Sequence, residues 1–363
     1  MSIAANGQDV ALVAAIEGVR PLSDRWRREA AARLDRLTKP PGSLGRLEEI
    51  AIRCCGIQET LEPATSPRRI VVCAADHGVV AAGVSAYPQA VTAQMVANFV
   101  KGGAAINALA TVAHADVWIV DVGVAGPLAA EGGHARFLSR RVKNSTRNML
   151  EEAAMTEAEM RSALQVGFDL AADAAAGGVR LIGLGEMGIG NTTAASAVTA
   201  ALTGRPARLV TGVGTGIDDK TFARKVEVVE QALTRHGLAG SGPLDVLRSV
   251  GGLEIATLAG VCLGAAGHRL LIVTDGFVAT SAALVAAALA PSVTDYVFAA
   301  HLSPEPGHAV QLEHLGLIPL LNLSMRLGEG TGAALAMPLI DAAVRAFTSM
   351  ATFESAGVSG QGS

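Results

Sequence analysis

Five mostly apolar runs constrain the fold of this chain more than any other feature. With the residues that end them, they cover residues 70–78, 117–123, 179–183, 270–276 and 296–301. A continuous apolar run is typical of a strand buried on both faces of a parallel sheet. Stretches with helical spacing separate the runs, and this alternation indicates right-handed βαβ units. We therefore predict an α/β fold with a mostly parallel sheet flanked by helices.

The predicted helices fall into three groups along the chain. Helices at 22–37 and 46–59 precede the first strand and are separated by a Pro-Pro-Gly sequence, which ends helices. Those of the α/β region are expected at 90–113, 156–176, 192–202, 218–236, 252–264 and 277–290. The chain is helical again from residue 331 and ends in a tail, 354–363, that we expect to be disordered. We predict a small helical lobe from residues 1–65 and 331–363 beside an α/β domain of residues 66–330.

Charge and cysteine usage exclude several classes of protein. The net charge is −4 and no Lys/Arg run occurs, so we expect no nucleic-acid partner. The four cysteines show no CxxC spacing, and Cys73 and Cys262 lie in apolar runs typical of buried free thiols. This usage indicates a reducing compartment. Because the N-terminus also lacks the order of a signal peptide, we expect a soluble, cytoplasmic protein.

One uncharged stretch has the composition of a membrane span. It lies between Asp275 and Asp295 and is interrupted by Pro291. The helical part is about 14 residues, which is too short to cross a bilayer. We predict a buried helix there and no membrane span.

A glycine-rich segment at residues 183–188 matches GxGxxG after a predicted strand and continues into a helix near Thr192. Free amides and the dipole at such a helix N-terminus favour a phosphate. A dinucleotide site also needs an acidic residue at the end of the next strand, and the region 207–211 has none. Glu186 would moreover face the pyrophosphate. We therefore favour a single phosphate over a dinucleotide, with a tight turn that binds nothing as the alternative.

A second glycine-rich segment, residues 212–216, precedes the predicted helix 217–236. It is another possible anion site, and Lys225 on that helix is a cation that could reach a phosphate. The alternative for Lys225 is a solvated helix face.

The segment 327–332 places Glu329 between glycines, directly before an apolar helix. The helix dipole favours a carboxylate at this position and tends to keep it ionised. An ionised carboxylate on a tight loop is a candidate general base. The alternative is a helix cap, in which Thr331 or Glu329 only accepts from amides of the first turn.

Other polar residues follow the predicted strands or lie between helices. His77, His301 and His308 suggest a metal, but the spacing of metal ligands is absent, and no GxSxG nucleophile occurs. We expect no metal, and we expect Ser303 to cap a turn or to bind a ligand. The region from Tyr87 to Asn107 could form the wall of an aromatic slot, or it could be core packing with a helix break at its glycine pair.

Six stretches together resemble one family. They are residues 38–48, 75–79, 185–193, 275–277, 300–303 and 326–338. In this order they are similar to the nicotinate-nucleotide–dimethylbenzimidazole phosphoribosyltransferase family of cobalamin biosynthesis (the CobT family). The likeness runs from about residue 20 to residue 350, and the glutamate-bearing glycine loops near 186 and 329 are its most specific parts. The resemblance implies a Rossmann-like sheet, a small helical lobe and a homodimer.

The resemblance also implies roles for particular residues. Glu329 matches the general base that takes the proton from the benzimidazole nitrogen, and Glu186 matches a second active-site glutamate. The residues implied to contact the phosphate and ribose are Gly188, Gly190, Lys225, Ser303 and Gly328. Those implied to form the benzimidazole slot are Tyr87, Gln94, Met187 and Leu327.

The implied reaction transfers phosphoribose from nicotinate mononucleotide to 5,6-dimethylbenzimidazole, without metal or cofactor. One departure from the family is Val213, where many relatives have an arginine in a Gly-Arg-Gly-Thr-Gly loop. The alternatives are the same transfer to another benzimidazole, a purine or a phenol, a non-catalytic nucleotide-binding protein, and a nicotinamide-dependent dehydrogenase. The missing ribose-binding acid argues against the dehydrogenase.

Overall fold

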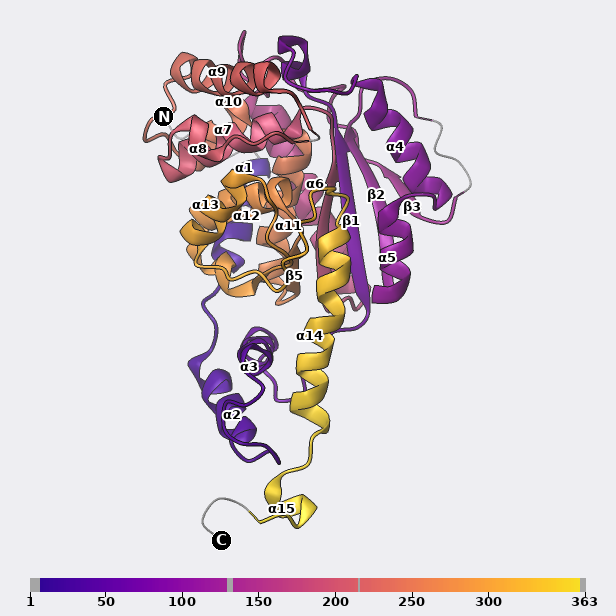
Figure 1. The fold of residues 1–363 in the computed structure, drawn as a ribbon, viewed down its shortest axis with the longest axis vertical. Helices are drawn as coiled ribbons and strands as arrows, with labels where there is room; N and C mark the ends of the chain where they lie inside the picture. The colour runs from indigo at the N-terminus through magenta and orange to yellow at the C-terminus, as the bar shows by residue number, and fades with distance from the viewer. Residues whose placement is uncertain (1–6, 129–132, 215, 360–363) are drawn as a thin grey trace.

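The computed structural model describes residues 7–128, 133–214 and 216–359, and its centre is a six-stranded parallel sheet (Figure 1). The strand order is β3-β2-β1-β4-β5-β6, and every pairing is parallel. The strands are β1 Arg68–Ala75, β2 Ala115–Gly123, β3 Arg136–Ser139, β4 Leu181–Met187, β5 Leu271–Thr274 and β6 Val297–Ala299. The predicted α/β fold with a parallel sheet is confirmed, and the order is that of a Rossmann sheet.

The helices surround this sheet. The structure contains α1 Gly7–Gly18, α2 Asp24–Leu34, α3 Arg46–Gln58, η1 Gly78–Ala82, α4 Ala90–Lys101, α5 Ala105–Ala113, α6 Glu157–Ala176, α7 Asn191–Thr203, α8 Ala207–Val210, α9 Asp219–Arg235, α10 Pro243–Val250, α11 Leu253–Gly267, α12 Phe277–Leu289, η2 Pro291–Tyr296, α13 Pro306–Leu315, α14 Thr331–Ser349 and α15 Phe353–Ala356. α6 and α11 pack together on one side of the sheet, where α11 contacts β1, β2, β4 and β5. α4, α5 and α14 cover the other side, and α14 lies in front of the sheet in Figure 1.

The sheet differs from the prediction at two strands, β3 and β4. β3 was not expected, because it has only four residues and lies half-exposed at the sheet edge. β4 continues to Met187, so Gly183 and Gly185 lie inside the strand rather than in a turn after it. A Cβ at Gly185 would lie 2.6 Å from the carbonyl oxygen of Glu329. The glycine there thus allows the turn before α14 to cross the strand closely.

The predicted helix 90–113 is two helices. α4 ends at Lys101, and Gly102 has a φ of 82°, which turns the chain before α5 begins at Ala105. By length and composition alone, residues 90–113 would be apolar enough to cross a membrane. In the structure the two helices have only 12 and 9 residues, and both pack on the sheet. The uncharged stretch after Asp275 forms α12, which is buried as predicted.

A second hydrophobic cluster lies at the lower end of the molecule in Figure 1, away from the sheet. It joins Leu34 of α2, Cys55 of α3 and Phe347 near the end of α14. α1, which we expected in this lobe, packs instead on α6 and α11, because its Leu12 belongs to the main core. The tail from residue 354 begins within α15, and residues 360–363 lie outside the described residues. The rest of the domain division stays a prediction.

Candidate active site

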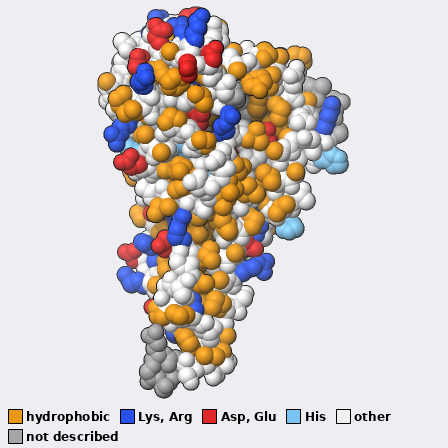
Figure 2. All heavy atoms as spheres, viewed as in Figure 1, with side chains coloured by type: hydrophobic (Ala, Val, Ile, Leu, Met, Phe, Trp, Pro, Cys, Tyr) orange, Lys and Arg blue, Asp and Glu red, His pale blue; other side chains and the backbone are white. Residues whose placement is uncertain are grey.

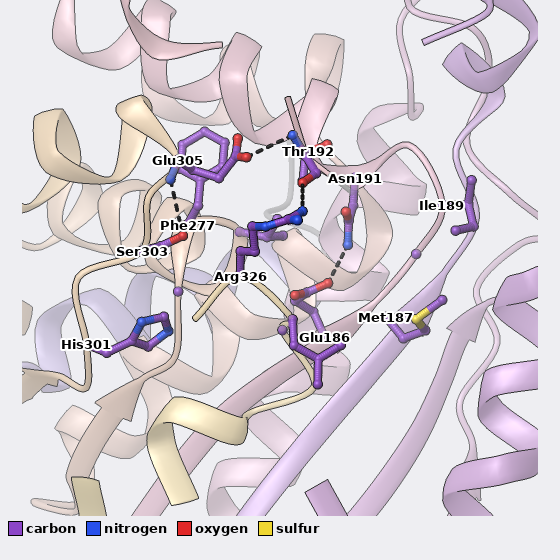
Figure 3. Close-up of a pocket in the computed structure, with 16 residues that line it drawn as sticks. Glu186, Met187, Ile189, Asn191, Thr192, Phe277, His301, Ser303, Glu305 and Arg326 are labelled. Atoms are coloured by element: carbon purple, nitrogen blue, oxygen red, sulfur yellow. Dashed lines mark hydrogen bonds between the residues drawn. The ribbon is translucent and has the colours of Figure 1, made fainter. Parts of the chain in front are cut away.

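A pocket lies beyond the carboxyl ends of β4, β5 and β6, where ligands bind in open parallel sheets (Figure 3). Its walls come from five parts of the chain that are far apart in the sequence. They are the end of β4 with the start of α7 (186–192), Gly214, the start of α12 (276–278), the loop after β6 (301–305) and the turn before α14 (326–328). The predicted polar ends of three strands therefore do meet at one site.

The N-terminus of α7 faces this pocket. Its N-cap, Gly190, has a φ of 95°, and no side chain among the described residues caps the helix. Asn191 and Thr192 of its first turn line the pocket together with Gly188. Since helix N-termini carry a partial positive charge, this wall can hold an anion. Contacts from Gly188 and Gly190 to a phosphate stay a prediction.

Lys225 of α9 is buried beside this wall and is only 1% exposed. Its Nζ donates to Thr192 Oγ1 (2.9 Å) and to the carbonyl oxygen of Gly212 (3.1 Å). Burial lowers the pKa of Lys225 to about 8, and the negative charge of Glu305 opposes that change. An ammonium has three donors, so two are used by described residues and one is available to an anion. The alternative of a solvated helix face for Lys225 is wrong.

The second glycine segment does not form an anion site of the predicted kind. α9 begins at Asp219, later than predicted, and its N-cap Asp218 already accepts from the amide of Thr221 (2.8 Å). The amide of Gly214 donates to Glu305 Oε1 (2.8 Å). Thr215 of the same segment lies outside the described residues. The segment therefore contributes to the pocket by its backbone position at Gly214, not by a free helix N-terminus.

Glu186 is the next-to-last residue of β4 and lies in the wall of the pocket. Burial, followed by the charges of Asp275 and Glu254, raises its pKa to about 8. Asn191 Nδ2 donates to its carboxylate (Figure 3). At neutral pH this side chain is therefore mostly a neutral acid that can both donate and accept hydrogen bonds.

Glu329 lies in the turn before α14 and is buried, with a φ of 64°. Its Oε2 accepts from the amide of Ile106 (3.3 Å) in the first turn of α5, so the carboxylate does not cap α14. Asp275, at the end of β5, does that instead: its carboxylate accepts from the amides of Gly330 (2.9 Å) and Gly332 (2.7 Å). The cap alternative for Glu329 is wrong, and Asp275 is the residue that sequence reasoning missed for this role.

The ionisation of Glu329 also differs from the expectation. Burial raises its pKa, the hydrogen bond from Ile106 opposes this, and the charge of Asp275 adds to it. Asp275, not Glu329, accepts from the amides of the α14 N-terminus, so that helix end does not offset the effect of burial on Glu329 as expected. A carboxylate with a raised pKa is a stronger base near neutral pH, which suits proton transfer.

The residues expected around the benzimidazole do not all meet in this pocket. Met187 and Leu327 line it, whereas Tyr87 is 50% exposed and Gln94 is exposed on α4. Glu329 lies beside the pocket through its neighbour Gly328, with its side chain directed to α5. The benzimidazole slot therefore stays a prediction for all four residues.

His77 pairs with Glu254, whereas the rings of His301 and His308 are neighbours, with centroids 6.2 Å apart. His77 Nε2 lies 2.7 Å from Glu254, and although burial works to lower its pKa, the charge and hydrogen bond of Glu254 raise it. His308 accepts from the Ser303 amide (3.0 Å), and burial followed by the charge of His301 lowers its pKa to about 3. Among the described residues, no group of three or more His, Cys, Asp or Glu side chains could hold a metal ion.

Two charged residues of the pocket were not singled out from the sequence. Figure 3 shows the Arg326 guanidinium within the pocket, where Nη1 donates to the carbonyl oxygen of Gly214 (3.0 Å). The Glu305 carboxylate accepts from the backbone N–H of the same residue, Gly214. Glu305 lies two residues after Ser303, and Arg326 lies in the loop before Glu329. Both are close to residues that we did consider, but a single charged residue in a loop has no spacing pattern that would identify it.

Comparison with known proteins places this site in a family context. Residues 19–358 match a family model described as phosphoribosyltransferase. A relative from Chloroflexus aurantiacus, named nicotinate-nucleotide–dimethylbenzimidazole phosphoribosyltransferase, is 54% identical over 344 residues, which are 95% of this chain and 97% of the relative. One from Geobacter metallireducens with the same name is 50% identical over 347 residues, 96% of this chain and 98% of the relative. The crystal structure of CobT from Thermus thermophilus superposes on this chain with a TM-score of 0.88 and 50% sequence identity. The match covers 92% of this chain and 99% of the Thermus chain.

Proposed function

The chain belongs to the phosphoribosyltransferase family, and from this membership we propose that it transfers phosphoribose from nicotinate mononucleotide to 5,6-dimethylbenzimidazole. The products are α-ribazole 5′-phosphate, which supplies the lower ligand of cobalamin, and nicotinate. The observation that supports the proposal is the uncapped N-terminus of α7 in one pocket with the half-buried Glu186 and beside the buried Glu329, two glutamates whose pKa values are raised. The relatives named for this reaction cover nearly the whole chain.

The phosphate of nicotinate mononucleotide binds at the α7 N-terminus in this proposal. The backbone at Gly188 and Gly190 and the ammonium of Lys225 supply the positive charge. Ser303 and Gly328 line the pocket, where they contact the phosphoribose. The phosphate is a handle and not the reacting group, so the transfer needs no metal at this position.

The reaction requires one proton acceptor. The unprotonated ring nitrogen of dimethylbenzimidazole attacks C1′ of the ribose, and the bond from C1′ to the pyridinium nitrogen breaks. Nicotinate keeps that electron pair and leaves as a pyridine with a neutral nitrogen, so it needs no acid. The attacking base loses its N–H proton, which Glu329 takes, at a gain of about 10²–10⁴ in rate. Direct displacement inverts C1′ and gives the α product.

Negative charge near the pocket suits this chemistry. Glu186, Asp275 and Glu329 lie close enough that the charges of Asp275 and Glu329 raise the pKa of Glu186. The pyridinium substrate is cationic at its ring, and positive charge develops at C1′ as the bond breaks. The carboxylate of Asp275 stabilises such charge, whereas the neutral Glu186 contributes hydrogen bonds.

The proposal also specifies the base that accepts the phosphoribose. We infer a slot for dimethylbenzimidazole from Met187 and Leu327, which line the pocket, and from the roles that the family resemblance implies for Tyr87 and Gln94. Transfer to another benzimidazole, a purine or a phenol would use the same Glu329 and the same phosphate contacts. A competition assay between dimethylbenzimidazole and adenine distinguishes these acceptors.

We also propose that the protein is a cytoplasmic homodimer. Figure 2 shows hydrophobic side chains gathered along α14 and α5 on one face. Exposed apolar residues of this region include Val112 at 65% and Leu327 at 57%. Apolar area of this kind is typical of protein interfaces. Sedimentation of the purified protein tests the dimer.

The reaction is tested by incubating the protein with nicotinate mononucleotide and dimethylbenzimidazole and following products by chromatography and mass. We expect α-ribazole phosphate and nicotinate in equal amounts, and their loss in Glu329→Gln. Tight binding of the nucleotide without any turnover would instead favour a non-catalytic nucleotide-binding protein.

A further inference from the structure

We propose that Glu305 is a positioning residue for the substrate phosphate, because it holds residues 212–214 and the Lys225 ammonium in the arrangement that binds that phosphate. The inference rests on the proposed function, since the phosphate is that of nicotinate mononucleotide. Four observations carry it: the direction of the Glu305 side chain, its packing, its unpaired oxygen and its charge beside Lys225.

The Glu305 carboxylate points away from its own helix. Glu305 is the N-cap residue of α13, but its side chain makes no cap hydrogen bond there. Oε1 instead accepts from the amide of Gly214 (2.8 Å), across the pocket wall (Figure 3). A capping role is therefore not the reason for a carboxylate at this position.

The segment 212–214 is held on three sides by charged side chains. Gly212 packs directly on Glu305 Oε2, and a Cβ at Gly212 would clash with that oxygen. The carbonyl oxygen of Gly212 accepts from Lys225, and that of Gly214 accepts from Arg326. Glu305 is the only carboxylate among these three groups, so it sets both the position of the segment and the balance of charge.

The second oxygen of Glu305 is buried without a hydrogen-bond partner among the described residues. Leaving a buried carboxylate oxygen unpaired is unfavourable unless a nearby charge compensates it. Lys225 provides that charge, since Glu305 is the group that acts to raise the lysine pKa. Thr192, which faces Lys225 from α7, carries no charge, and Arg326 is the other charged side chain at this segment.

The consequence concerns the charge of Lys225 near neutral pH. Burial lowers the pKa of Lys225 to about 8 even with Glu305 present. Without the Glu305 carboxylate the pKa falls further, so a larger share of the lysine is neutral and cannot hold a phosphate. Val213, between Gly212 and Gly214, is uncharged and therefore cannot replace the lost positive charge of Lys225.

The test is the affinity for nicotinate mononucleotide, measured by calorimetry from neutral to alkaline pH. Wild type and Glu305→Gln are compared, each also in a Lys225→Arg background. We expect affinity to fall with rising pH in wild type, and the midpoint to move down by about 1 pH unit in Glu305→Gln. Above both midpoints the variant then binds about tenfold more weakly. With Lys225→Arg the shift should vanish, because a guanidinium stays charged.

Two controls separate this effect from general damage. Glu313→Gln makes the same change of charge on an exposed residue of α13 and should leave the midpoint unchanged. Nicotinate riboside, which lacks the phosphate, should bind equally to wild type and Glu305→Gln. If Glu305→Gln fails to fold, Glu305→Asp is measured in its place. It keeps the negative charge but moves it back by one methylene, so the midpoint should move in the same direction by a smaller amount.

An unchanged midpoint in Glu305→Gln or Glu305→Asp overturns the inference, as does a loss of affinity that is equal at every pH. A wild-type protein that binds no nicotinate mononucleotide at any pH would instead contradict the proposed function itself. The two failures are therefore distinguishable.

Discussion

The turns before α7 and α14 share a sequence signature but differ in what occupies the helix end. Both have a glycine N-cap with positive φ, 95° at Gly190 and 85° at Gly330, and neither helix has an acidic residue in its first turn. At α14, Asp275 from β5 accepts from the first-turn amides. At α7 no side chain from the part of the chain that the structure describes caps the helix, and the first turn lines the pocket. One turn is therefore open to an anion, and the other is already neutralised.

In the proposed function, this difference gives the two turns separate tasks. The open α7 turn would bind the phosphate, whereas Glu329 in the α14 turn would take the proton. The two are also tied together, because the amide of Glu329 donates to the carbonyl oxygen of Glu186 (3.3 Å), at the end of the strand that leads to α7. The distance between phosphate and base is thus fixed by the sheet, which favours a reproducible reacting geometry.

The largest effect that tests this division is expected in Glu329→Gln. Glutamine can still accept from the Ile106 amide but cannot take a proton. We expect kcat to fall by about 10²–10⁴, while KM for nicotinate mononucleotide stays near the wild-type value. Because burial raises the pKa of Glu329, kcat of the wild type should also fall as pH drops through that raised pKa. Steady-state rates across pH measure both.

The matched control is Glu227→Gln, which removes a carboxylate from the exposed face of α9. A Glu329→Gln variant with wild-type kcat would place the base elsewhere, with Glu186 as the next candidate. A rise in KM for the nucleotide larger than the fall in kcat would contradict the division of tasks between the two turns.

Asp275→Asn should have the next largest effect, on stability. Asparagine retains one acceptor oxygen and turns an NH₂ group toward an amide that also donates, so a buried N–H loses its partner. The expected loss in free energy of unfolding is about 1–3 kcal/mol. Urea unfolding measures it, and Asp169→Asn on the exposed side of α6 is the control. An unchanged midpoint with an unchanged slope would mean that α14 does not depend on this cap.

Glu186→Gln should change how stability depends on pH. The pKa of Glu186 is raised from 4.5 to about 8, first by burial and then by the charges of Asp275 and Glu254. Between those values the folded protein holds a proton that the unfolded chain has released, so the free energy of unfolding decreases as pH rises. Glutamine removes this contribution, and the slope in that window should become flatter. Urea unfolding at several pH values tests this, and an identical slope in both proteins would contradict it.

The contrast between the two turns also shows what the sequence could predict. The parallel sheet followed from continuous apolar runs, and every predicted run forms a strand. Glu186 and Glu329 were identified because each is a carboxylate within a run of glycines. Local patterns of this kind can be interpreted from the sequence because they depend only on neighbouring residues in the chain.

Long-range partners were not predictable in the same way. Asp275 follows a predicted strand, but nothing in the spacing says that it caps a helix 55 residues later. The extension of β4 through Gly185 depends on the close approach of Glu329, and the burial of Lys225 depends on Thr192 and Gly212. These features arise from strand order and packing, which bring together residues whose local sequences carry no sign of the contact.

The smallest effect is expected from Val213→Arg, and it tests whether the open α7 turn is complete as an anion site. Val213 is 46% exposed, so the change in free energy of unfolding should stay within about 0.5 kcal/mol. An arginine at this position would add a solvent-exposed charge worth at most about 1 kcal/mol, so KM for nicotinate mononucleotide should fall by no more than about fivefold. Salt should remove that gain, because exposed charges are screened. A much larger gain that persists in salt would mean that Lys225 and the α7 amides leave part of the phosphate charge unmatched in this chain.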